Sequence, residues 1–135
     1  MMARSVTIVV GRVPDKVLLP NQRRKAPHWA PISEATSTLR KQAGADSINA
    51  RIDRFLEPVI VEYLVRWPFT RYSAKQKLPD VDGLPTACKA ILDGLVDTCV
   101  IRDDCADVVI EVRARQERTD GDGSVVVTIT ETWEA

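Results

Sequence analysis

The sequence is poor in the residue types that bind zinc or form disulfide frameworks. It has three cysteines and one histidine among 135 residues. An odd, widely spaced set of three cysteines does not build a disulfide framework, and it lacks the paired spacing of a structural zinc site. We therefore expect a chain that folds without covalent or metal cross-links, in a reducing cytosol.

Long hydrophobic runs are absent as well. No apolar stretch approaches the roughly 20 residues of a membrane span, and the first ten residues lack the cleavage-site pattern of a secretory signal. Hydrophobic residues make up 44% of the sequence and charged residues 28%, which is typical of a globular protein. The length predicts one domain, residues 1–135. The lack of a long apolar run predicts that the protein has no membrane partner.

The sequence also has no net charge, but its charges are unevenly distributed. Lys+Arg and Asp+Glu number 19 each. Residues 1–77 hold 14 basic and 6 acidic residues, hence +8, whereas residues 78–135 hold 5 and 13, hence −8. A basic half suits a polyanion-binding surface and an acidic half suits a cation site, although solvated helix faces would give the same counts.

Hydrophobic periodicity predicts an α+β fold, in which helices pack on one mixed β-sheet. Alternating or β-branched runs predict strands at 5–10, 59–67, 108–115 and 125–129. Apolar positions three and four apart predict a helix at 32–43 that stops at Gly44, a second that Ser47 caps and Pro58 ends, and a third at 84–96. The last two strands are expected to form a hairpin around an Asp-Gly turn at 119–123.

Two aspartates that lie two residues apart form the most informative part of the sequence. In extended chain Asp80 and Asp82 would point the same way, so that each carboxylate raises the proton affinity of the other unless a cation neutralises them. Mg²⁺ is the usual partner of such carboxylates. If the pair Asp103-Asp104 lies beside them, the group suits metal-assisted phosphodiester hydrolysis. Alternatively, these residues only form turns and helix caps.

Lys89 lies in the first turn of the helix predicted after the aspartates. The helix dipole disfavours a cation at this position. We expect its side chain to lean back toward Asp82, where it would meet a phosphate or a metal-bound carboxylate. The alternative is an ion pair with Asp93, four residues further along the helix.

A second acidic stretch, residues 120–131, has the ligand spacing of a calcium-binding loop. Its glycine position is occupied by Val125, and the stretch alternates like a strand. We therefore interpret it as a turn followed by a strand rather than as a calcium site.

Three segments together resemble the RusA-like Holliday-junction resolvases. They are Asp80-x-Asp82, then Lys89-Ala90-x-x-Asp93-Gly94-Leu95, then Asp103-Asp104 followed by Val108. The stretch Pro85-Thr86-Ala87-Cys88-Lys89 is similar to one branch of that family, and Leu19-Pro20-Asn21 with Arg23, Arg24 and Trp29 is a weaker match. The resemblance covers most of the chain, residues 17–112.

The resemblance implies a homodimeric endonuclease, encoded by bacteria or phages, that acts on four-way DNA junctions. It implies that Asp80, Asp82 and Asp104, with Asp103 adjacent, bind Mg²⁺ or a substituting Mn²⁺, and that Lys89 is catalytic. The family usually has asparagine where this sequence has Gly83. That departure keeps open a non-catalytic branched-DNA-binding protein on the same fold. A third possibility is a metal-independent module whose acidic half docks a basic partner.

Basic residues in two predicted loops, 11–31 and 70–79, are the candidates for binding DNA phosphates. They are Arg23, Arg24 and Lys25 in the first loop and Arg71, Lys75 and Lys77 in the second. Because phosphate contacts release counterions, we expect DNA binding that weakens steeply with salt.

Overall fold

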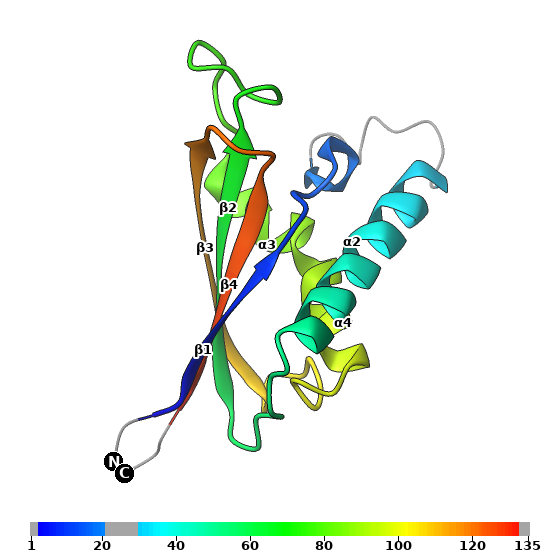
Figure 1. The fold of residues 1–135 in the computed structure, drawn as a ribbon, viewed down its shortest axis with the longest axis vertical. Coiled ribbons are helices and arrows are strands. Elements are labelled where there is room, and N and C mark those ends of the chain that lie inside the picture. The colour runs from blue at the N-terminus through cyan, green and yellow to red at the C-terminus, as the bar shows by residue number, and fades with distance from the viewer. Residues whose placement is uncertain (1–2, 21–29, 133–135) are drawn as a thin grey trace.

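Four strands form one mixed sheet in the order β1-β4-β2-β3 (Figure 1). The computed structural model describes residues 3–20 and 30–132. The strands are β1 (Ser5–Val10), β2 (Val59–Pro68), β3 (Val109–Thr119) and β4 (Ser124–Glu131). β4 is antiparallel to both β1 and β2, whereas β3 is parallel to β2. The predicted class, helices against a mixed sheet, is confirmed.

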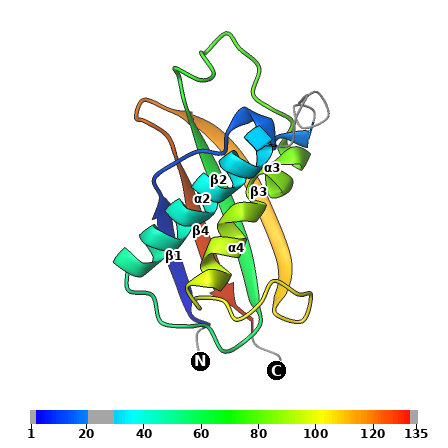
Figure 2. The ribbon, with the colours of Figure 1, turned by 90° about the vertical axis from the view of Figure 1, so that its right-hand side faces the viewer.

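The helices lie on one face of this sheet (Figures 1 and 2). They are α2 (Ala30–Asn49), α3 (Leu84–Ala87) and α4 (Lys89–Asp97). The 3-10 turn η1 (Lys16–Leu18) lies between β1 and α2, and η2 (Val81–Gly83) lies between β2 and α3. Val61, Tyr63 and Val65 of β2 are buried on alternate positions, as expected for a strand with one face on the core. None of the helices in the described residues is both long and apolar enough to cross a membrane.

One long helix replaces the two that the sequence predicts before β2. α2 continues through Gly44, and Ser47 is buried within it instead of capping a new helix. The cause is close packing against α4, because a Cβ at Gly94 would lie 2.4 Å from the carbonyl oxygen of Arg40. Across the same seam, Ser47 Oγ lies 2.8 Å from Thr98 Oγ1. The small residues therefore let two helices approach, and the prediction of a helix break was wrong.

The strands β3 and β4 are not hairpin partners, because β2 lies between them. The turn 120–123 therefore crosses over the end of β2. Gly123 has φ +92°, and a Cβ there would lie 2.7 Å from Pro68 Cδ, so this crossing requires glycine. The prediction of a paired hairpin was wrong. Residues 120–131, which have the ligand spacing of a calcium-binding loop, contain the strand β4, as their alternation predicts.

The connection from β2 to β3 carries most of the candidate site residues. After β2 the chain forms a loop, residues 69–80, that extends beyond the end of the sheet (top of Figure 1). It then passes through η2, α3 and α4 and returns by residues 98–108 to β3. The predicted helix at 84–96 forms as α3 and α4, which meet at Cys88. One acidic pair precedes these helices and the other follows them.

Candidate functional site

Asp80 and Asp82 lie at the turn η2, just before α3. Both are exposed, and neither side chain forms a hydrogen bond or ion pair within residues 3–20 and 30–132. The turn is closed by the amide of Gly83, which donates to the carbonyl oxygen of Asp80 at 3.2 Å. The two carboxylates are therefore held on a short ordered turn and are open to solvent.

Gly83, the departure from the RusA-like pattern, has a packing cause. It is buried, and a Cβ at this position would lie 3.0 Å from Cδ of Pro20. A Cβ at this position, that of asparagine included, would be in tight contact with the proline ring, which would have to shift slightly. The glycine therefore accommodates the segment that follows η1.

Lys89, the first residue of α4, connects the helix to the loop that follows it. Its Nζ donates to Oδ1 of Asp93 at 2.9 Å and to Oδ2 of Asp104 at 2.5 Å. Oδ1 of Asp103 accepts a hydrogen bond from the amide of Asp104 at 2.8 Å. The expectation that Lys89 leans toward Asp82 was wrong, because within the described residues its Nζ contacts Asp93 and Asp104 and not Asp82. The alternative ion pair with Asp93 is present, together with the contact to Asp104.

The ion pair shifts the protonation of both partners. Partial burial disfavours the Lys89 ammonium, but hydrogen bonds to Asp104 and Asp93 outweigh this and raise the pKa of Lys89. The hydrogen bond from Lys89 in turn lowers the pKa of Asp104. The exposed fractions of the two side chains are 51% and 42%, so solvent screens the interaction. At neutral pH the pair is a charged ammonium and a charged carboxylate.

A pocket of about 450 Å³ opens beside this ion pair. Its walls come from β2, β3, α3 and α4, and most of them are apolar. The lining residues are Tyr63, Pro85, Thr86, Lys89, Leu92, Asp104, Val109 and Val112. An apolar pocket with a few convergent polar groups is a common form of ligand site.

The structure does not gather the three predicted metal ligands into one group. Within residues 3–20 and 30–132, no three side chains of His, Cys, Asp or Glu lie close enough together to hold a metal ion. Lys89 compensates the charge of Asp104, whereas Asp80 and Asp82 precede α3 without a partner in the described chain. Carboxylate oxygens are the ligands that Mg²⁺ prefers, but a three-carboxylate site requires the two segments to approach each other.

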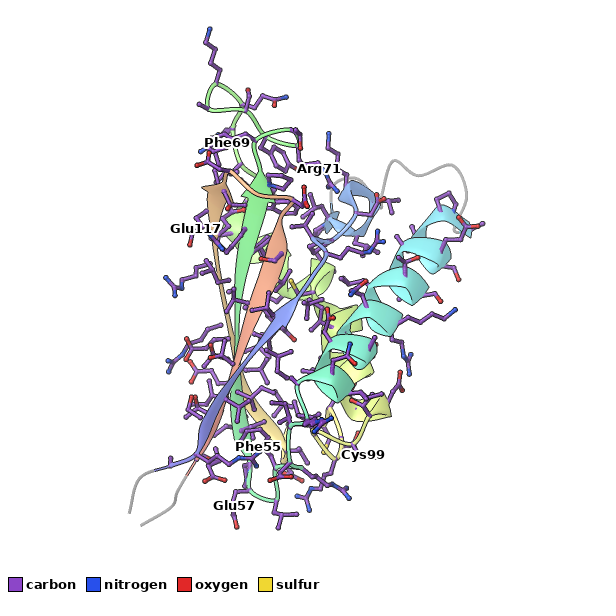
Figure 3. All side chains as sticks on the ribbon, viewed as in Figure 1. Phe55, Glu57, Phe69, Arg71, Cys99 and Glu117 are labelled. Carbon is purple, nitrogen blue, oxygen red and sulfur yellow. The ribbon has the colours of Figure 1, made fainter. Side chains whose placement is uncertain are left out.

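The predicted phosphate-binding residues have different surroundings. Lys75 and Lys77 are exposed on the loop beyond the sheet. Arg71 is half-buried: its Nη1 donates to the carbonyl oxygen of Pro14 at 3.2 Å, and its guanidinium lies 5.6 Å from the centre of the Trp67 ring (Figure 3). Arg23, Arg24 and Lys25 lie outside the described residues. Among the predicted cations that the structure describes, Lys75 and Lys77 thus have the freest access to a phosphate.

Sequence reasoning missed two residues that hold this loop. Gln116 and Arg118, both on β3, hydrogen-bond to its backbone. Both lie beyond the end of the predicted strand, 108–115, and polar residues at alternate positions of a strand normally indicate the solvent face. The alternation places Gln116 and Arg118 on the same face of the strand as Val112, but no sequence signal shows that this face meets the loop.

No protein-family model and no curated protein matches this chain. The resemblance to RusA-like resolvases therefore rests on the residues and spacings of the sequence.

Proposed function

We propose that this protein is a Mg²⁺-dependent endonuclease of the RusA-like type that cuts four-way junctions or related branched DNA. In this proposal Asp80, Asp82 and Asp104 hold the metal, with Asp103 beside them, and Mn²⁺ can replace Mg²⁺. Lys89 is the catalytic cation.

The contact between Lys89 and Asp104 is the observation that carries the proposal. The resemblance assigns these two positions to one site, and they meet at 2.5 Å although they are 15 positions apart in the sequence. They also border the pocket formed between the helices and the edge of the sheet. A cation, a carboxylate and an accessible pocket at one place are typical of catalytic sites.

In this proposal other described residues take the remaining roles of a phosphodiesterase. Lys75 and Lys77 can contact the DNA backbone without reading its sequence. Lys89 can stabilise the negative charge that develops on the phosphate or on the leaving oxygen. The exchange of its partners, from Asp104 to the substrate phosphate, would release that carboxylate for the metal. When bound, Mg²⁺ would lower the pKa of a water molecule and act as a Lewis acid.

The second candidate is a branched-DNA-binding protein without catalysis. Gly83 in the place of the family asparagine and the separation of the carboxylates favour it. In that case Lys89 would keep Asp104 neutralised permanently. A metal-independent protein-docking module is the third candidate, and it predicts no affinity for DNA at moderate salt.

We further propose that the protein acts as a homodimer. The proposed function gives each chain one active site, and resolving a four-way junction takes two symmetric cuts, which a two-fold dimer supplies. Within the described residues, no helix covers the outer face of the sheet, where Leu64 and Val126 lie opposite each other. Light scattering at micromolar concentration measures the mass. A mass near that of one chain, 15.0 kDa, with full cleavage activity would contradict the dimer.

The decisive experiment measures binding and cleavage of a synthetic four-way junction, with linear duplex of the same sequence as control. The endonuclease predicts cuts in Mg²⁺ or Mn²⁺ and none in EDTA. Binding without cuts in either metal would favour the second candidate, and absence of both would favour the third.

A further inference from the structure

The edge strand β3 presents one row of side chains to the helix side of the sheet. In the register with β2, Gln116 lies opposite Val65 and Arg118 lies opposite Trp67. Val65 and Trp67 are fully buried. Glu117, between the two polar residues, lies on the other face of the sheet (Figure 3). Gln116 and Arg118 are therefore directed to the side on which the loop and η2 lie.

Gln116 links the buried core to the residue just before Asp80. The indole Nε1 of Trp67 donates to Oε1 of Gln116 at 2.9 Å, and Nε2 of Gln116 donates to the carbonyl oxygen of Pro79 at 2.5 Å. The indole can only donate, so it fixes the orientation of the amide: oxygen toward Trp67, NH₂ toward Pro79. The position of Pro79 is thereby set by a side chain that the core itself orients.

Arg118 holds the same loop at a different point. Its Nε donates to the carbonyl oxygen of Ser73 at 3.2 Å, and its Nη2 donates to that of Gln76. Ser73 and Gln76 also close a turn with each other, through the backbone and through the Gln76 side chain. Lys75 lies inside this turn and Lys77 directly follows it. Arg118 of β3 thus anchors residues 73–77, the cationic turn, and Gln116 of β3 anchors the end of the loop at Pro79.

We propose that Gln116 is a positioning residue for the Asp80–Asp82 turn. Gln116 fixes the backbone from which the two carboxylates extend, at a set place relative to the core and to Lys75 and Lys77. The inference rests on the proposed function, because it gives those carboxylates a role in cleavage. Arg118 serves as the matched comparison for Gln116. It lies on the same face of β3, but it holds the cationic turn and not the turn that carries the carboxylates.

The experiment compares Gln116→Met, Gln116→Glu and Arg118→Met with the wild type, measuring the affinity for a four-way junction and the single-turnover cleavage rate at saturating protein. Gln116→Glu keeps an acceptor for Trp67 but loses the donor to Pro79. Both Gln116 variants should lower the rate about tenfold or more and change the affinity less than about twofold. Arg118→Met should weaken affinity about threefold or more and leave the saturated rate within about twofold.

A general loss of structure would lower affinity, rate and melting temperature together. Loss of rate alone in the Gln116 variants and loss of affinity alone in Arg118→Met therefore distinguish positioning from unfolding. Either Gln116 variant cutting at the wild-type rate would overturn the proposal. If the wild type cuts no junction, the proposed nuclease fails, and amide hydrogen exchange then tests Gln116 by itself. Faster exchange at residues 80–83 in Gln116→Met than in Arg118→Met would support positioning of this turn, and equal exchange would overturn it.

Discussion

The ammonium of Lys89 lies 2.5 Å from Oδ2 of Asp104, a carboxylate 15 residues further along the chain. The contact joins the first residue of α4 to the loop that leads into β3. It places a cation on one of the carboxylates that the proposed reaction needs. How Lys89 shares its charge between Asp104 and the substrate is therefore the first property to test.

Lys89→Met should abolish most cleavage while the protein stays folded. Removing one donor that stabilises charge in the transition state typically lowers the rate about 100- to 1000-fold, and we expect a loss of this order. The ion pair is half-exposed, so the melting temperature should change little. Single-turnover cleavage of a four-way junction measures the effect. Arg40→Met, which removes the exposed ion pair between Arg40 and Asp97, is the control and should cut normally. Wild-type cleavage by Lys89→Met would confine this lysine to a structural role.

Periodicity was sufficient to predict the strands and the helical segment that carries Lys89, because local burial dictates both. It could not predict the order of the strands. A turn such as 120–123 has the same residues whether it joins neighbours or crosses another strand, and only Gly123 against Pro68 distinguishes the two. Gly44 was misinterpreted for a similar reason, since a glycine that ends a helix and one that admits a second helix have the same local signal.

The candidate site was predictable as a set of residues and not as an arrangement. The sequence identifies Asp80, Asp82, Lys89 and Asp104 through their spacing. The partners of Lys89 depend on where the loop 98–108 returns, which is a tertiary property. Gln116 was not predictable, because its role depends on the burial of Trp67 and on the path of the loop 69–80, in which its partner Pro79 lies 37 positions earlier in the sequence.

Gly94→Ala should destabilise the protein, whereas Gly44→Ala should not. A Cβ at Gly94 would meet the carbonyl oxygen of Arg40 at 2.4 Å, a backbone atom that moves only with the helix. Overpacking of this kind typically costs about 1–3 kcal/mol in the free energy of unfolding. At Gly44 the nearest atom is the Thr98 methyl at 3.4 Å, so the gain of about 1 kcal/mol from helix propensity should survive. Urea unfolding measures both, and equal stability of the variants would contradict the α2–α4 packing.

Acid should weaken the fold through carboxylates that are paired with cations. Hydrogen bonds from Arg40 and Lys89 lower the pKa of Asp97 and Asp104 respectively. The unfolded chain therefore binds more protons in acid than the folded protein does. The stabilisation is present above the unfolded pKa of about 3.9 and is lost as pH falls through the lower folded values. Urea unfolding, repeated at steps of about one pH unit from about pH 6 down to about pH 3, should show this decline in the free energy of unfolding. Asp97→Asn should make the decline shallower. An unchanged slope in that variant would remove Asp97 as a contributor.

The three cysteine thiols should differ in reactivity. Burial raises the pKa of Cys88 to about 12, and the thiol lies where α3 meets α4, without access to solvent. Cys99 and Cys105 are exposed on the loop after α4, and Figure 3 labels Cys99 there. Because the thiolate is the reactive form, a thiol reagent at neutral pH should modify two cysteines in the folded protein and the third only in denaturant. Rapid modification of all three would contradict the burial of Cys88.

Asp82→Asn tests the central claim most directly, with junction binding and junction cleavage measured side by side in Mg²⁺. Asparagine keeps the shape of the side chain, and Asp82 has no partner in the described chain, so the fold should survive. Cleavage should be lost, while affinity should persist or increase because one negative charge less faces the phosphates. Asp53→Asn, an equal charge change on an exposed residue between α2 and β2, should cut and bind like the wild type. Wild-type cleavage by Asp82→Asn would remove this carboxylate from the site and contradict the nuclease proposal.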